Sequence, residues 1–149
     1  MKAMIFAAGL GTRLRPFTDT MPKALIPVGG KPMLEHVILK LIASGFDELV
    51  VNIHHHGQQI IDFLKSKNNF GVRIHISDER DALLDTGGGI KHARKFLAGN
   101  APFLVHNADI LSNLDLSQFS QYHTLPPSPL VRVGVILLGS RRHNERYFL

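Results

Sequence analysis

The fold of this chain is decided by the stretch Met4-Ile5-Phe6-Ala7-Ala8-Gly9-Leu10-Gly11-Thr12-Arg13-Leu14-Arg15-Pro16-Phe17-Thr18-Asp19-Thr20-Met21-Pro22-Lys23. In it, an apolar strand runs directly into a glycine-rich loop that carries three basic side chains. Gly9 and Gly11 let backbone N–H groups approach anionic oxygens, because a Cβ would block that approach or forbid the required φ. Arg13 offers a planar guanidinium for bidentate phosphate contact, and Lys23 adds a compact positive charge. The pattern therefore predicts a phosphate-binding loop after the first strand.

Two common phosphate-binding motifs do not fit this loop. The dinucleotide-binding fingerprint requires a third glycine at the position of Leu14. A Walker A loop requires Ser or Thr after Gly30-Lys31, where this chain has Pro32. A tight surface turn with solvated basic side chains remains the alternative, because glycine marks turns in proteins of every class.

Outward from this stretch, segments with a strand pattern alternate with segments of helical spacing. We expect strands at 4–8, 48–53, 72–76, 103–105 and 131–138. We expect helices from Pro32 to a stop at Gly45, and at 58–65, 90–97 and 116–122. This alternation predicts an α/β fold, a Rossmann-like three-layer sandwich with a mostly parallel sheet and helices on both faces. Ligands bind such sheets at the carboxyl ends of the strands.

Two further segments at that edge carry candidate binding residues. Asp109 follows a buried strand, and a carboxylate there can hold Mg²⁺, although it could instead cap the next segment. Asp85-Thr86-Gly87-Gly88-Gly89 precedes the expected helix at 90–97, and its glycines allow close backbone approach to a flat ring. Asp85 or Thr86 could instead cap that helix.

Composition narrows the class of protein. The 149 residues suit one domain, and 44% hydrophobic with 19% charged residues is typical of a soluble globular chain. No apolar run reaches the roughly 18 residues that span a bilayer, and no signal peptide precedes the first strand. The chain has no cysteine, which excludes disulfides, thiolate metal sites and cysteine nucleophiles. We therefore expect a cytoplasmic protein that does not bind a membrane.

The positive charge has two possible meanings. The net charge is +5 and the pI about 9.8, which could indicate nucleic-acid binding. The basic residues are not interleaved with aromatic ones, and there is no tryptophan. Arg13, Arg15, Lys23 and Lys31 gather near the glycine loop, and a second group is Arg141, Arg142 and Arg146. A small polyanion fits this distribution better than nucleic acid does, and we expect no nucleic-acid partner.

The histidines are poor metal-site candidates. His54, His55 and His56 are consecutive, so on a strand they alternate between faces and cannot easily converge on one ion. We interpret them as a polar strand end. His106 lies close to Asp109, but a histidine at the end of a strand is more often structural.

The chain resembles a known family over most of its length. The residues that carry the resemblance are Ala7-Ala8-Gly9-Leu10-Gly11-Thr12-Arg13, Arg15-Pro16, Pro22-Lys23-Ala24-Leu25, Pro27-Val28 and Gly30-Lys31-Pro32-Met33-Leu34. Together they resemble the signature of sugar-1-phosphate nucleotidyltransferases, which make nucleotide-diphospho-sugars. The glycine-rich segment at 85–89 is similar to a subgroup that contains N-acetylmuramate-1-phosphate uridylyltransferases and mannose-1-phosphate guanylyltransferases. This resemblance favours UTP or GTP and does not decide between uracil and guanine.

The resemblance implies a reaction and a set of site residues. A nucleotidyl group passes from a nucleoside triphosphate to a sugar 1-phosphate, with Mg²⁺ as cofactor. Arg13 and Lys23 are then catalytic, the first holding pyrophosphate and the second the α-phosphate, and Asp109 binds the metal. The family usually has glycine before this aspartate, and here Ala108 replaces it. The implied nucleotide-binding residues are Ala7, Ala8, Gly9, Gly11, Thr12, Arg13, Lys23, Asp85, Thr86, Gly87 and Gly88.

The resemblance also implies an incomplete active site. Members of the family usually continue well beyond 149 residues, and the remainder supplies the sugar-binding wall and a second metal-binding carboxylate. We expect residues 1–149 to form a single, truncated domain that catalyses poorly. The alternative function is a module that binds a nucleotide or sugar nucleotide without chemistry. Formation of a homo-oligomer stays open.

Overall fold

A computed structural model describes residues 1–99 and 101–124, with side chains described as far as residue 121. The main strands are β1 (Lys2–Phe6), β4 (Glu48–Ile53), β5 (Arg73–Asp78) and β6 (Phe103–Asn107), and β2 (Pro27–Val28) pairs with β3 (Lys31–Pro32) in a small antiparallel sheet. The helices are α1 (Met33–Ala43), α2 (Gly57–Ser66), α3 (Asp85–His92), α4 (Arg94–Leu97) and α5 (Leu116–Thr124). Short 3₁₀ turns are η1 (Thr12–Leu14), η2 (Phe17–Asp19), η3 (Lys23–Leu25) and η4 (Asn68–Gly71).

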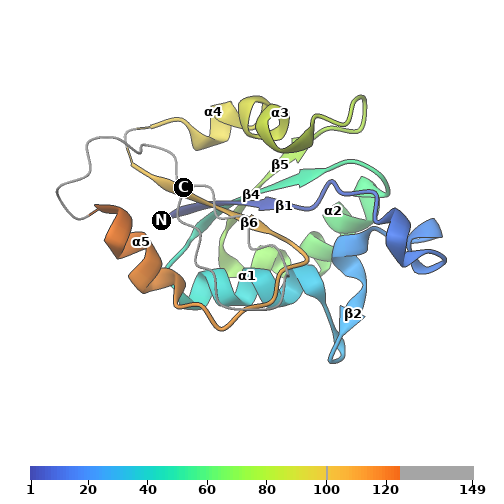
Figure 1. The fold of residues 1–149 in the computed structure, drawn as a ribbon, viewed down its shortest axis with the longest axis horizontal. Helices are drawn as coiled ribbons and strands as arrows, with labels where there is room; N and C mark the ends of the chain where they lie inside the picture. Colours follow the sequence, from blue (N-terminus) through green and yellow to red (C-terminus); the bar gives the residue numbers. More distant parts are fainter. Residues whose placement is uncertain (100, 125–149) are drawn as a thin grey trace.

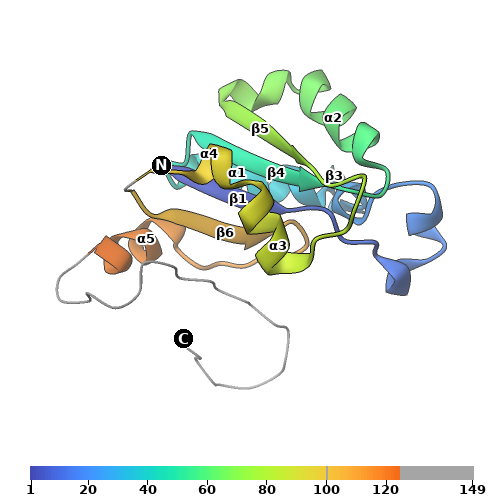
Figure 2. The same ribbon diagram turned by 90° about the horizontal axis from the view of Figure 1, so that it is seen from above.

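The four main strands form one parallel sheet in the order β5–β4–β1–β6 (Figure 2). In this order β1 is a central strand, hydrogen-bonded to β4 on one side and β6 on the other. The carboxyl ends of all four strands therefore meet at one edge of the sheet, and the loop after β1 starts in the middle of that edge.

Helices cover both faces of the sheet, which confirms the three-layer sandwich (Figure 1). On one face, Ala3 and Ile5 of β1 pack with apolar side chains of α1, α2 and α5. On the other face, Met4 packs with Ile90 of α3, Leu97 of α4 and Ala93 between the two helices. Successive side chains of β1 thus enter opposite cores, which explains why this strand has no polar residue between Ala3 and Phe6.

Most of the expected elements are present, with shifted ends. The strand at 48–53 and the helix that stops at Gly45 are confirmed, and Gly45 has a φ of 85°. The first strand was expected at 4–8 but ends at Phe6, because the backbone N–H groups of Ala7 and Ala8 donate to a side chain instead of a neighbouring strand.

The glycine-rich segment differs from its prediction. It was expected to be a turn before a helix at 90–97, but α3 already begins at Asp85, and a break at Ala93 separates α3 from α4. The glycines therefore lie inside a helix that packs closely on the sheet, and this packing compensates for their low helix propensity. The expected strand at 131–138 lies outside the described residues, and the single-domain assignment of 1–149 stays a prediction.

Candidate active site

In the glycine loop after β1, Gly11 is packed against other residues of the same loop. Gly11 has a φ of 65°, and a Cβ on it would lie 2.7 Å from Thr18 Cγ2 and 3.0 Å from Lys23 Cβ. The Thr18 hydroxyl donates to the Gly11 carbonyl at 2.9 Å. Gly9 has no protein atom within 4 Å of the corresponding position. Gly11 is therefore required by the protein itself, whereas Gly9 leaves an open space beside the loop.

Lys23 and Asp109 are brought together although 86 residues separate them. The Lys23 ammonium donates to Asp109 Oδ2, and the two side chains are 27% and 35% exposed. Lys23 opens η3 after Pro22, and Asp109 lies in the turn that follows β6. The Ala108 N–H donates to the Phe6 carbonyl at 3.0 Å, which ties that turn to the end of β1. The expected phosphate-binding cation and the expected metal-binding carboxylate thus share one place at the carboxyl edge.

The substitution of alanine for the family's usual glycine fits this turn. Ala108 is 3% exposed and belongs to the main hydrophobic core. Its methyl group points into apolar packing and leaves Asp109 partly exposed.

Arg13 takes no part in the Lys23–Asp109 ion pair. It lies on the exposed turn η1, and no ion pair joins it to another of the described residues. Thr12 is also exposed, and Arg15 pairs with Asp19 at 3.3 Å. The proposed roles of Arg13 and Thr12 in phosphate binding therefore stay predictions.

Two buried polar residues that the sequence analysis did not single out lie behind the loop. Asn52 of β4 and Glu79, just after β5, are each 2% exposed. Asn52 Oδ1 accepts the backbone N–H groups of Ala7 at 2.7 Å and Ala8 at 3.3 Å. Asn52 Nδ2 donates to Glu79 Oε1 at 2.9 Å. A polar residue inside the otherwise apolar run Leu49–Ile53 was the signal in the sequence that could have identified Asn52.

These bonds change the expected contribution of Ala7 and Ala8. Both residues remain at the site, but their N–H groups already donate hydrogen bonds to Asn52 Oδ1. They form a buried wall of the loop, and the backbone donors open to a ligand begin further along, towards Gly9.

The glycine helix packs against the same two residues. A Cβ on Gly89 would lie 3.0 Å from Glu79 Oε1 and 3.3 Å from Asn52 Nδ2. The second oxygen of Glu79, Oε2, is buried without a hydrogen-bond partner among the described residues. Neither Asp85 nor Thr86 caps α3 with its side chain, so the alternative interpretation of these residues as helix caps is wrong. Asp85, Thr86 and Gly87 are exposed along the first turn of α3, with Gly88 half-buried.

The described histidines that lie near the site bind backbone carbonyls or one another's rings. The His54 Nδ1–H donates to the Glu79 carbonyl at 2.6 Å, and the rings of His55 and His56 lie 3.9 Å apart. His106 Nδ1–H donates to the Asn107 carbonyl at 2.8 Å, and burial lowers the pKa of His106. Among residues 1–99 and 101–124, no group of three or more metal-ligating side chains comes together.

Asp109 by itself suits a magnesium ion that is shared with a ligand. Mg²⁺ keeps several waters and is commonly held by one or two carboxylates together with substrate phosphates. A single, partly exposed carboxylate beside a phosphate-type loop has this chemistry. Without a phosphate ligand, one carboxylate would hold the ion only weakly.

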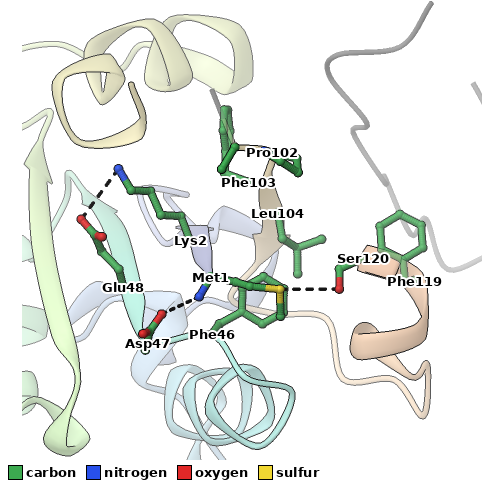
Figure 3. A pocket seen from close by; sticks show the side chains of 11 residues that line it. Met1, Lys2, Phe46, Asp47, Glu48, Pro102, Phe103, Leu104, Phe119 and Ser120 are labelled. Carbon is green, nitrogen blue, oxygen red and sulfur yellow. Dashed lines mark hydrogen bonds and ion pairs between the residues drawn. The ribbon is translucent and has the colours of Figure 1, made fainter. Parts of the chain in front are cut away.

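A separate cavity of about 360 Å³ lies at the other end of the sheet (Figure 3). It is lined by the first residues of three strands, Lys2, Glu48 and Phe103, and by Phe119 of α5. Its walls are mostly apolar, and it has no part in the carboxyl-edge site.

Comparison with known proteins identifies the family. The nucleotidyl transferase family matches residues 2–147. An N-acetylmuramate alpha-1-phosphate uridylyltransferase from Neisseria meningitidis is 45% identical over 127 residues, which are 85% of this chain and 54% of that protein. A mannose-1-phosphate guanyltransferase from Aspergillus fumigatus is 37% identical over 125 residues, 83% of this chain and 34% of that protein.

Solved structures agree with this match. HddC from Yersinia pseudotuberculosis in complex with GMP-PN is 29% identical, with a TM-score of 0.73 over 83% of this chain and 54% of that one. A UDP-glucose pyrophosphorylase in complex with UDP-glucose is 26% identical, with a TM-score of 0.65 over 82% of this chain and 52% of that one. The chain spans about half the length of the two N-acetylmuramate alpha-1-phosphate uridylyltransferases that it matches. Its sequence, its parallel sheet and its glycine loop together show that it belongs to the nucleotidyl transferase family.

Proposed function

We propose that this chain binds a nucleoside triphosphate with Mg²⁺, and that its protein transfers the nucleotidyl group to a sugar 1-phosphate. The observation that carries the proposal is the meeting of Lys23 and Asp109 beside the Gly9–Gly11 loop. A purely structural ion pair has no need of an open glycine loop next to it. The relatives named above are transferases of this type, which supports the same reaction class.

The reaction is an in-line displacement at the α-phosphorus. A phosphate oxygen of the sugar 1-phosphate forms the new P–O bond, and the bond to pyrophosphate breaks. The nucleophile is already an anion, so no general base is needed and catalysis rests on positioning and charge neutralisation. Asp109 would hold the metal, which supplies positive charge to the phosphate oxygens. Lys23 would neutralise the α-phosphate, and Arg13 would hold the departing pyrophosphate.

Glu79 supports a preference among the bases. Its Oε2 is a buried acceptor without a described partner, close to the glycine helix. A carboxylate accepts hydrogen bonds only, so it suits a base with a ring N–H, as in uracil, thymine or guanine. Cytosine and adenine present a ring acceptor at that position, which would face the carboxylate unpaired. We therefore propose UTP or GTP ahead of CTP or ATP.

The surroundings of the protein are also part of this proposal. Among the described residues no helix is long and apolar enough to cross a membrane. The absence of cysteine from the sequence is compatible with a reducing compartment. We propose a cytoplasmic protein whose partners are small phosphorylated molecules.

Thermal unfolding with a panel of triphosphates tests the binding. A ligand at about a hundred times its dissociation constant adds roughly 2.7 kcal/mol to the free energy of unfolding. We expect a shift with UTP or GTP that needs Mg²⁺ and disappears with chelator. Lys23→Met and Asp109→Asn should each lose the shift, whereas Lys65→Met, an exposed lysine of α2, should keep it. No shift with any triphosphate would contradict the proposal.

A second candidate function is nucleotide binding without turnover. It needs only the open space beside Gly9 and the Lys23 ammonium, both of which the described residues provide. Release of pyrophosphate from UTP or GTP upon addition of a sugar 1-phosphate separates the two functions. A metal-dependent shift without any pyrophosphate release would favour the binding module.

A further inference from the structure

The amide of Asn52 lies at the centre of a buried hydrogen-bond chain. Phe6, Asn52 and Ser77 are in register on adjacent strands, so Asn52 projects from the face of the sheet that α3 and α4 cover. On this face its Oδ1 accepts two backbone N–H groups from the residues that lead into the glycine loop. Those N–H groups lie beyond the last residue of β1 and would otherwise be buried without a partner.

Glu79 determines the orientation of the Asn52 side-chain amide. A carboxylate has no proton to donate, so the Asn52 atom that faces Glu79 Oε1 at 2.9 Å has to be the NH₂ group. The carbonyl oxygen of the same amide is then forced towards Ala7 and Ala8. A flipped amide would place NH₂ against two N–H donors and leave both unpaired.

The backbone N–H and the backbone carbonyl of Glu79 are both hydrogen-bonded. Its N–H donates to the Ile53 carbonyl at 2.8 Å, and its own carbonyl accepts the His54 ring N–H at 2.6 Å. Gly89 lies so close that even one methyl group would crowd Glu79 and Asn52. Both side chains are 2% exposed and joined to each other by a hydrogen bond.

We infer that Asn52, oriented by Glu79, is a positioning residue for the phosphate loop. This inference rests on the proposed function, since it assumes that the loop binds phosphate. Its consequence is that Glu79 affects phosphate affinity through Asn52, even for a ligand that has no base. A Glu79 that contacted only the base, or served only to fill the core, would have no such effect.

Two neutral substitutions of similar length isolate this effect. Glu79→Gln and Glu79→Met both remove the negative charge, but only glutamine keeps an oxygen that accepts from Asn52 Nδ2. The probe is inorganic tripolyphosphate with Mg²⁺, which has no base, measured by isothermal titration calorimetry. We expect the Met variant to bind tripolyphosphate roughly tenfold more weakly than the Gln variant. Hydrogen exchange in the free protein should also be faster at the Ala7 and Ala8 amides of the Met variant.

A second set of variants, in which the amide and the carboxylate exchange places, tests the inference even if the Glu79→Met variant does not fold. Asn52→Asp alone places two carboxylates in contact, whereas Asn52→Asp with Glu79→Gln restores one donor between them and the formal charge of the natural pair. We expect the double variant to bind tripolyphosphate about tenfold more tightly than the single Asn52→Asp variant.

The outcomes separate this inference from the function on which it rests. Equal tripolyphosphate affinities and equal amide exchange in the Gln and Met variants would overturn the role of Asn52 alone. A natural chain that binds neither tripolyphosphate nor any triphosphate would overturn the proposed function and this inference with it.

Discussion

Gly9 and Gly11 stand two residues apart in one loop, but they meet different constraints. A side chain at Gly11 would be strained by the φ of 65° and would collide with Thr18 and with the Cβ of Lys23. We expect Gly11→Ala to lower the free energy of unfolding by about 1–3 kcal/mol, as measured by urea denaturation. Gly9→Ala is the matched control, because nothing lies within 4 Å of its added methyl group.

The Gly9→Ala variant also tests ligand binding. Gly9→Ala should change the free energy of unfolding by about 0.5 kcal/mol or less, yet weaken triphosphate binding, because the methyl group enters the open space beside the loop. Equal stability of the two variants would contradict this division between the two glycines.

We expect Lys23 to compete with a metal ion for Asp109. In the free protein the ammonium is already paired with Oδ2, so a divalent cation would have to displace it. We expect Lys23→Met to bind Mn²⁺, in the absence of nucleotide, about two- to fivefold more tightly than the natural chain. Electron paramagnetic resonance of free Mn²⁺ measures this affinity. Asp109→Asn is the control and should lose binding, and an unchanged affinity in Lys23→Met would contradict the competition.

Helix α3 contains three glycines in very different surroundings. Gly87 is exposed, with nothing within 4 Å of an added methyl group, whereas Gly89 is buried against Asn52, Glu79 and Phe6. We expect Gly87→Ala to raise the free energy of unfolding by about 0.5–1 kcal/mol, because alanine is the better helix former. Gly89→Ala should lower it, because the methyl group would separate α3 from the buried hydrogen-bond chain. Thermal unfolding of both variants measures the difference, and a stabilised Gly89→Ala would contradict this packing.

Strand β6 contains a buried histidine, His106, from which we expect a pH dependence of stability. Burial lowers the pKa of His106 from its ordinary value of 6.5, since the charged imidazolium loses its hydration. Between the lowered and the ordinary pKa, the unfolded chain is protonated and the folded chain is not, so stability rises with pH. The contribution of His106 is therefore complete above the ordinary pKa and is lost as the pH falls through the lowered one.

A single substitution isolates this contribution. His106→Asn keeps a donor near the position of Nδ1 and cannot titrate. We expect its free energy of unfolding to fall less than that of the natural chain between about pH 7 and pH 5. Urea denaturation at each pH measures both slopes, and identical slopes would contradict the role of His106.

At the scale of the whole molecule, the proposed reaction needs two substrates held together. Its carboxyl edge carries the loop that we propose for phosphate and the carboxylate that we propose for metal, and the chain matches 54% of the Neisseria meningitidis relative. We expect a chimaera of residues 1–124 with the remainder of the Neisseria meningitidis relative to release pyrophosphate at least about tenfold faster than this chain, because both substrates must be held in line. Asp109→Asn in the chimaera is the control. Equal rates for the chimaera and the chain would contradict the expectation.

The sequence was sufficient for the features that depend on neighbouring residues. The alternation of apolar strands with amphipathic helices predicted the three-layer sandwich, because each pattern follows from the geometry of one element. The ends of the elements were less certain. Whether β1 continued through Ala7 and Ala8 depended on Asn52, and whether 85–89 was a turn or a helix depended on its packing against Glu79.

By itself, the sequence determined that a glycine loop with basic residues follows a buried first strand, and that the chain is an α/β protein of the nucleotidyl transferase family. Only the tertiary structure decided that Lys23 pairs with Asp109, and that Glu79 orients Asn52 behind the loop. The physical reason is that these pairs join segments distant in the chain, which meet only where parallel strands lie in register. Propensity and periodicity act over a few residues, whereas the pairing of strands is set by the packing of the whole sheet.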